Sequence, residues 1–219
     1  MKQRNLKSTT VRQTALFPDK GQGAIIEDAY RYRLWRTWDT DRPSLVWILL
    51  NPSMADEHTD DPTLRRLLRF SQTFGYGGLV LVNLFAWQTP DPRLLSTVPD
   101  PVGPKNDHFI QEAVTQTEQI VIAWGNGGRY LHREQAVLAL LSSVPLSCLN
   151  VTRCGSPVHP LYQPRTRSLM PFLSPMTQGM CDVAGEWTGR TQGNDPLTSN
   201  DGVRHPEHEQ ATDHSERKP

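Results

Sequence analysis

Polar side chains with the chemistry of a reactive or binding site gather directly after the apolar run 45–50. The stretch supplies amide, hydroxyl, carboxylate, imidazole and guanidinium groups: Asn51, Ser53, Asp56, His58, Asp60, Asp61, Thr63, Arg65 and Arg66. A carboxylate there could act as a general base, and an arginine could hold a phosphate. The alternative is a solvated turn that leads into a helix, with an aspartate as N-cap and Pro62 in the first turn.

Polar groups also follow three later apolar runs of the chain. They are Asn83, Trp124 with Asn126, and Arg153 with His159. An amide offers a donor and an acceptor together, which suits the edge of a polar planar ring. A histidine can donate to a leaving group or neutralise the charge that develops on it.

Each of these signals also has a plain structural interpretation. Asn83 could satisfy a neighbouring backbone group, and Trp124 could belong to the core. The glycines at 125–128 fit neither a GxGxxG nor a Walker motif, so they could form an ordinary turn from strand to helix. His159 and Pro160 could make only a rigid turn.

Strands and helices that would position these residues alternate along the chain. Strands are expected at 30–38 (half-exposed), 45–50, 79–85, 120–124 and 146–151, and helices at 62–74, 106–117 (with Asn106 as its N-cap) and 130–141. This order predicts a three-layer α/β/α fold with a mainly parallel central sheet. The carboxyl ends of parallel strands share one edge, so Asn51, Asn83, Asn126 and His159 should converge there.

Composition limits the class of protein. The 219 residues divide into an expected flexible leader (1–23), a single α/β domain (24–170) and a disordered polar tail (171–219). Equal numbers of basic and acidic residues, 23 each, give a net charge of +0, which lacks the usual footprint of a duplex-binding protein. Neither a membrane span nor an apolar signal core is present, and three irregularly spaced cysteines suggest a reducing compartment. We therefore expect a cytoplasmic protein with no membrane partner, metal or cofactor.

The chain resembles a bacterial and phage family that is catalogued as domain of unknown function number 1643. The resemblance spans about residues 28 to 165. It is carried by blocks that occur in order: Tyr30-Arg31-Tyr32, Leu34-Trp35-Arg36, Ile48-Leu49-Leu50-Asn51-Pro52-Ser53, Ala55-Asp56, Asp60-Asp61-Pro62-Thr63, Arg65-Arg66, Gly75-Tyr76-Gly77-Gly78-Leu79, Asn83-Leu84-Phe85-Ala86, Asp100-Pro101-Val102-Gly103-Pro104, Asn106-Asp107, Ala123-Trp124-Gly125-Asn126 and His159-Pro160-Leu161-Tyr162. The chain departs from the family at Val151-Thr152-Arg153-Cys154-Gly155, where the family usually shows Leu-Thr-Lys-Asp-Gly. The resemblance therefore supports no role that needs an acid at position 154, and it brings no established activity.

The order of the polar blocks is also similar to that of the uracil-DNA glycosylase superfamily. That similarity implies that Asn51 positions an attacking water, that Asn83 reads the edge of a base and that His159 stabilises the departing base. Trp124-Gly125-Asn126 would close the third strand end. The chain differs from that superfamily in its neutral charge and in Leu161-Tyr162, which stand where a longer His-Pro-Ser-Pro loop carries an apolar wedge.

The first functional hypothesis is a glycosylase-like hydrolase that recognises a nucleobase or nucleotide and cleaves an N-glycosidic bond. Its expected catalytic residues are Asn51, Asp56, Asp61 and His159, and its expected substrate-binding residues are Ser53, Arg65, Arg66, Asn83, Trp124, Asn126 and Arg153. A second hypothesis is a non-catalytic protein that binds a nucleotide or modified base in phage DNA modification or defence. A third is a structural or interaction module. Under the first two, the partner is a nucleobase, a nucleotide or a nucleic acid.

Overall fold

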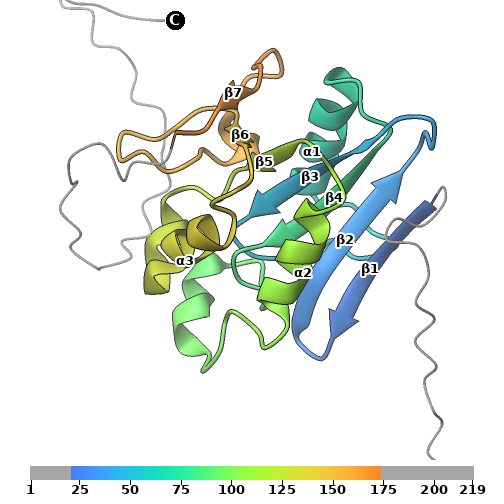
Figure 1. The fold of residues 1–219 in the computed structure, drawn as a ribbon. Coiled ribbons are helices and arrows are strands. Elements are labelled where there is room, and N and C mark those ends of the chain that lie inside the picture. Colours follow the sequence, from blue (N-terminus) through green and yellow to red (C-terminus); the bar gives the residue numbers. More distant parts are fainter. Residues whose placement is uncertain (1–20, 174–219) are drawn as a thin grey trace, which may run out of the picture. The chain divides into compact units, whose positions relative to one another are not determined.

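A computed structural model describes residues 21–173 of the chain (Figure 1). The predicted tail, apart from residues 171–173, and most of the predicted leader lie outside these residues. Residues 21–23, which we assigned to the leader, form the start of the first strand. None of the helices in this range combines the length and the apolar composition that crossing a membrane would require.

Seven strands form one mixed sheet in the order β1-β2-β4-β3-β5-β6-β7. They are β1 (Gly21–Glu27), β2 (Tyr30–Thr37), β3 (Ser44–Leu49), β4 (Gly78–Asn83), β5 (Ile120–Ile122), β6 (Leu146–Cys148) and β7 (Met170–Pro171). Three strand pairings are parallel and three are antiparallel. The expectation of a mainly parallel sheet therefore holds only for its centre, β4-β3-β5-β6.

The antiparallel edges arise from strands that precede or follow the βα units. β1 and β2 form a hairpin, which needs only a short turn, and β2 then pairs with β4. The alternation of side chains in residues 30–38 predicts a half-exposed strand, but none of the residues of β2 is exposed. β2 lies inside the sheet, where neighbouring strands flank it on both sides.

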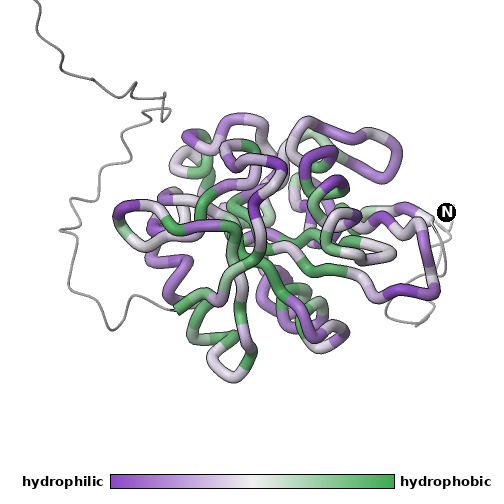
Figure 2. The backbone as a smooth tube through the Cα atoms, turned by 90° about the horizontal axis from the view of Figure 1, so that it is seen from above, coloured by the Kyte–Doolittle hydropathy of each residue, from purple (hydrophilic) through white to green (hydrophobic). Residues whose placement is uncertain are grey.

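Helices cover both faces of the sheet. The apolar stripe of α1 (Pro62–Thr73) packs with Trp47, Leu81 and other residues of one face. Helices α2 (Asn106–Val114) and α3 (Arg133–Leu140) pack on the opposite face with Ile48 and Val82. Hydrophobic stretches run through the middle of the described part of the molecule, and many hydrophilic stretches lie at its periphery (Figure 2).

Three short 3₁₀ helices connect these elements: η1 (Pro92–Thr97), η2 (Asn126–His132) and η3 (Pro160–Tyr162). The helix expected at 130–141 begins at Arg133 because Leu131 and His132 adopt left-handed backbone angles, which interrupt a right-handed helix. The sequence predicts Asn106 as the N-cap of α2, but the N-cap is Lys105. The buried Nδ2 of Asn106 turns inward and donates to the carbonyls of Asn83 (3.0 Å) and Leu84 (2.8 Å).

A register shift between β1 and β2 decides which face of the sheet each arginine of β2 faces. Ile25 pairs with Arg33 and Ile26 pairs with Arg31, so Tyr32 is left without a partner in β1. An extra residue of this kind shifts the alternation of side chains by one position. Arg31 consequently points toward the loop before α1, whereas Arg33 forms an ion pair with Glu112 of α2 at 3.2 Å.

Candidate functional site

The carboxyl ends of the parallel strands meet at one edge of the sheet, as the sequence predicts. Leu49 of β3 lies opposite Asn83 of β4, and the Ala123 N–H donates to the Ile48 carbonyl at 2.9 Å. The loop before η3 joins this edge, because the Gly125 N–H donates to the Pro157 carbonyl at 2.7 Å. The direction in which strands are added to the sheet reverses at β3, since β4 and β5 lie on opposite sides of β3. Ligands of doubly wound sheets bind at such a switch point.

The loop between β3 and α1 uses its amide and backbone groups to hold itself in place. The Asn51 Nδ2 donates to the carbonyls of Pro52 (2.9 Å) and Thr89 (2.8 Å). The Ser53 carbonyl accepts a hydrogen bond from the Gln88 Nε2 at 2.8 Å. The donor group of Asn51 is therefore committed to the backbone.

The carboxylates of this loop are also engaged. The Asp56 Oδ1 accepts hydrogen bonds from the backbone N–H groups of His58 (2.8 Å) and Thr59 (2.7 Å), and these bonds hold the pKa of Asp56 below its ordinary value. The Asp60 Oδ1 forms an ion pair with the buried guanidinium of Arg36 at 2.8 Å. Asp61 is the N-cap of α1, and its Oδ1 accepts from the Leu64 N–H at 2.7 Å. A pattern that could supply general bases is here largely a braced loop and a helix cap.

The two arginines that follow have different positions. Arg65 is exposed, and its Nη1 donates to the Asp60 carbonyl. Arg66 donates from Nε to the Pro160 carbonyl at 3.4 Å and from Nη2 to the Gln163 carbonyl. Arg66 therefore fastens α1 to the η3 segment that follows His159.

Asn83 is the predicted site residue whose side chain is both buried and incompletely paired. It is 1% exposed, and its Oδ1 accepts a hydrogen bond from the Arg31 Nη2 at 3.5 Å. Because a guanidinium offers only donors, the amide oxygen must face Arg31 and the Nδ2 must point away. Among the described residues neither this Nδ2 nor the Nε of Arg31 has a hydrogen-bond partner. Buried donors are almost always paired in native proteins, so two unpaired donors in neighbouring side chains are unusual.

Arg31 is a candidate that our sequence interpretation missed. Its side chain is 2% exposed, and burial lowers its pKa to about 10 against the raising effect of the Asp61 charge. Its Nη1 donates to the Ala55 carbonyl. The sequence signal was an arginine at the start of a strand rich in aromatic residues, but the strand periodicity gave no reason to expect it beside Asn83.

His159 is held as a neutral imidazole. Burial lowers its pKa to about 4, although the nearby charge of Asp61 opposes that shift. The Nδ1 accepts a hydrogen bond from the Leu161 N–H at 3.4 Å, which leaves the proton on Nε2. The charge of Asp61 thus raises the pKa of both Arg31 and His159 against the larger, lowering effect of burial.

Three other predicted residues have separate environments. Trp124 is buried in the core, and its Nε1 donates to the Glu134 Oε2 at 3.0 Å. Asn126 is exposed and accepts from the Thr152 Oγ1 at 2.8 Å. Arg153 is exposed as well. The strand ends share one edge, but no hydrogen bond within the described range joins the side chains of Asn51, Asn83, Asn126 and His159.

Within residues 21–173 no group of three or more histidine, cysteine or acidic side chains is placed to hold a metal ion. A cavity among the described residues lies between α1 and the loop after η3, and of the predicted site residues Arg66 lines it.

Comparisons with known proteins identify a family. The model of a family described as "Protein of unknown function (DUF1643)" matches residues 31–161. No curated protein and no solved structure matches the chain.

Proposed function

The chain belongs to the DUF1643 family, and from the geometry of its sheet edge we propose that it binds a nucleobase or nucleotide there. The observation that carries this proposal is the buried, unpaired Nδ2 of Asn83 at the carboxyl end of β4. An unpaired buried donor is costly, and a ligand acceptor would remove that cost. The position at the end of a parallel strand agrees with where ligands bind in α/β sheets.

Two groups at this edge are donors, and we take them to select the ligand. Asn83 offers its Nδ2 because its oxygen is occupied by Arg31, and neutral His159 offers its Nε2 proton. Both need acceptors such as the carbonyl oxygens of uracil, thymine or guanine. Adenine has no carbonyl oxygen and should bind more weakly. We further propose that the arrangement of helices on both sheet faces is of the uracil-DNA glycosylase kind, which is consistent with this placement.

A hydrolytic activity on the N-glycosidic bond is the second candidate. Neutral His159 favours it, because an Nε2 proton can stabilise negative charge on a departing base without first losing a proton. Asp61 is the carboxylate whose charge acts on that histidine, although it also caps α1. The braced positions of Asn51 and Asp56 favour binding over hydrolysis as the first function.

Titration calorimetry with UMP, GMP and AMP tests the binding proposal. We expect UMP or GMP to bind more tightly than AMP. Asn83→Asp replaces the free donor by an acceptor, and we expect it to weaken that binding at least about tenfold. Asn150→Asp is the matched control, since Asn150 uses its Oδ1 only as an acceptor for the Val151 N–H. Equal affinity of the wild type and Asn83→Asp would refute the proposal.

The hydrolytic candidate needs its own assay. Chromatography would measure free base released from nucleosides, nucleoside monophosphates and single-stranded and double-stranded DNA. A loss of release in His159→Asn that is much larger than its loss of nucleotide binding would support hydrolysis. Binding without any release would leave the protein as a nucleotide- or modified-base-binding protein, and failure of both assays would favour a structural or interaction module.

A further inference from the structure

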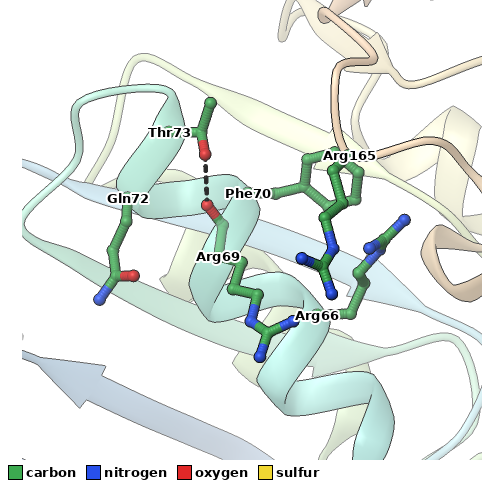
Figure 3. A pocket seen from close by; sticks show the side chains of 6 residues that line it. All are labelled: Arg66, Arg69, Phe70, Gln72, Thr73 and Arg165. Atoms are coloured by element: carbon green, nitrogen blue, oxygen red, sulfur yellow. Dashed lines mark hydrogen bonds between the residues drawn. The ribbon is translucent and has the colours of Figure 1, made fainter.

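A cavity of about 230 Å³ lies between helix α1 and the loop after η3 (Figure 3). Its lining residues are Arg66, Arg69, Phe70, Gln72, Thr73 and Arg165. Half of these residues are arginines, and none is acidic. In Figure 3 the guanidinium groups of Arg66 and Arg165 lie beside the Phe70 ring, and that of Arg69 lies farther from the ring. The cavity thus concentrates positive charge in a chain whose formal net charge is +0.

The positive charges are not neutralised by the protein around them. Neither Arg69 nor Arg165 forms an ion pair with any described residue, and both are exposed. Arg66 and Arg69 are three positions apart on one helix, a spacing at which like charges repel. A bound anion would offset this repulsion.

Arg66 gives the cavity a fixed wall. Its guanidinium lies over the Phe70 ring at 5.1 Å, and its Nε and Nη2 donate to backbone carbonyls of the η3 segment. No hydrogen bond joins its Nη1 to another described residue. Arg69 and Arg165 approach from α1 and from the loop after η3, so a ligand would be held from both elements.

We propose that this cavity binds the phosphate group of a small phosphorylated molecule. The planar fork of arginine matches phosphate oxygens in a bidentate geometry. The volume lies below the roughly 300–1,000 Å³ of pockets that enclose drug-sized ligands, which suits a phosphate group with a small substituent. The neutral total charge favours a small molecule over a long nucleic acid. The proposal does not depend on the nucleobase site at the strand ends.

Inorganic phosphate is the first probe, and the double variant Arg69→Gln/Arg165→Gln is the test. Titration calorimetry at constant ionic strength should show phosphate binding to the wild-type chain and at least about tenfold weaker binding to the double variant. Arg167→Gln is the matched control, because Arg167 is exposed, lies two positions from Arg165 and does not line the cavity. Absence of phosphate binding to the wild type, or an equal loss in Arg167→Gln, would overturn the proposal.

Thermal unfolding gives a second measurement on the same proteins. Phosphate should raise the Tm of the wild type and leave that of the double variant unchanged. In phosphate-free buffer, the double variant should unfold at the same or a higher temperature than the wild type, because the arginine repulsion has been removed. A lower Tm without phosphate would mean that the arginines serve stability, which contradicts an anion site.

Two further ligands separate the sources of the phosphate. UMP should be compared with a single-stranded oligonucleotide at equal phosphate concentration. If the oligonucleotide binds and UMP does not, the assignment to a small molecule is overturned. Uridine, which has no phosphate, should bind the double variant as it binds the wild type. Failure of the arginine cavity would then be distinguishable from failure of the base site.

Discussion

Two neighbouring regions at the sheet edge use their polar groups in opposite ways. The loop between β3 and α1 carries many polar residues, and Asp56, Asp60 and Asp61 are each bonded to a backbone N–H or to Arg36. The Asn83–Arg31 pair has few polar groups, yet it retains a buried Nδ2 and a buried Nε without partners among the described residues. The density of polar residues in a sequence therefore does not show which polar groups remain free in the fold.

This difference predicts that substitutions in the loop reduce stability, while substitutions at Asn83 change ligand binding. The predictions below test that contrast in order of their expected effect on the free energy of unfolding.

The largest effect is expected from Arg36→Ala in β2. Arg36 is 6% exposed and donates to the Asp60 carboxylate and to the Asp56 carbonyl at 2.7 Å, so its removal leaves both acceptors unpaired. We expect a loss of about 2–3 kcal/mol, reduced from the fully buried case because Asp60 is partly exposed. Urea denaturation followed by circular dichroism measures it. Arg33→Ala is the control on the other face of β2, where the pair with Glu112 should cost about 1 kcal/mol or less. Equal losses of unfolding free energy in the two variants would contradict the view that Arg36 stabilises the loop between β3 and α1.

The second effect is a dependence of stability on pH through His159. The folded-state pKa of about 4 lies below the ordinary value of 6.5, so the unfolded chain binds the proton more readily. Stability from His159 is complete above about pH 6.5 and is lost as the pH falls toward about 4. Urea denaturation at pH 7, 5.5 and 4.5 should show this loss in the wild type.

The variant His159→Asn separates the histidine from the acidic residues that also titrate at low pH. Its loss of stability between pH 7 and 4.5 should be smaller than that of the wild type. Identical pH profiles for the two proteins would show that His159 is not held neutral by its surroundings.

A smaller effect is expected at the helix cap. Asp61→Ala removes the acceptor for the Leu64 N–H and should cost about 1 kcal/mol in urea denaturation. Asp61→Asn keeps an acceptor oxygen, so it should retain most of the stability while it removes the charge that raises the pKa of His159. Nuclear magnetic resonance titration of His159 should therefore show a lower pKa in Asp61→Asn. An unchanged pKa would mean that this carboxylate does not act on the histidine.

The smallest effect on stability is expected from Asn83→Asp. The new carboxylate would lie beside the Arg31 guanidinium, and the unpaired Nδ2 would be removed, so the free energy of unfolding should change by less than about 1 kcal/mol. Nucleotide binding should nevertheless be lost. A large loss of stability with unchanged binding would reverse the comparison between the two regions.

Local sequence patterns are sufficient to predict most of the elements that build the site. The predicted spans 45–50, 62–74 and 79–85 match β3, α1 and β4 to within about two residues. These spans follow from local periodicity, from Pro62 near the helix start and from glycines after its end. The shared edge of the parallel strand ends followed from the same order of elements.

The tertiary structure alone decided which polar groups remain free. Arg31 contacts groups that lie 24 and 52 positions away in the chain, and Arg66 contacts Gln163 over 97 positions. Local patterns carry no information on such distant partners, and the irregularity at Tyr32 shifted the side of the strand that Arg31 faces. Whether a polar residue braces a loop or awaits a ligand is therefore fixed by the packing of remote segments.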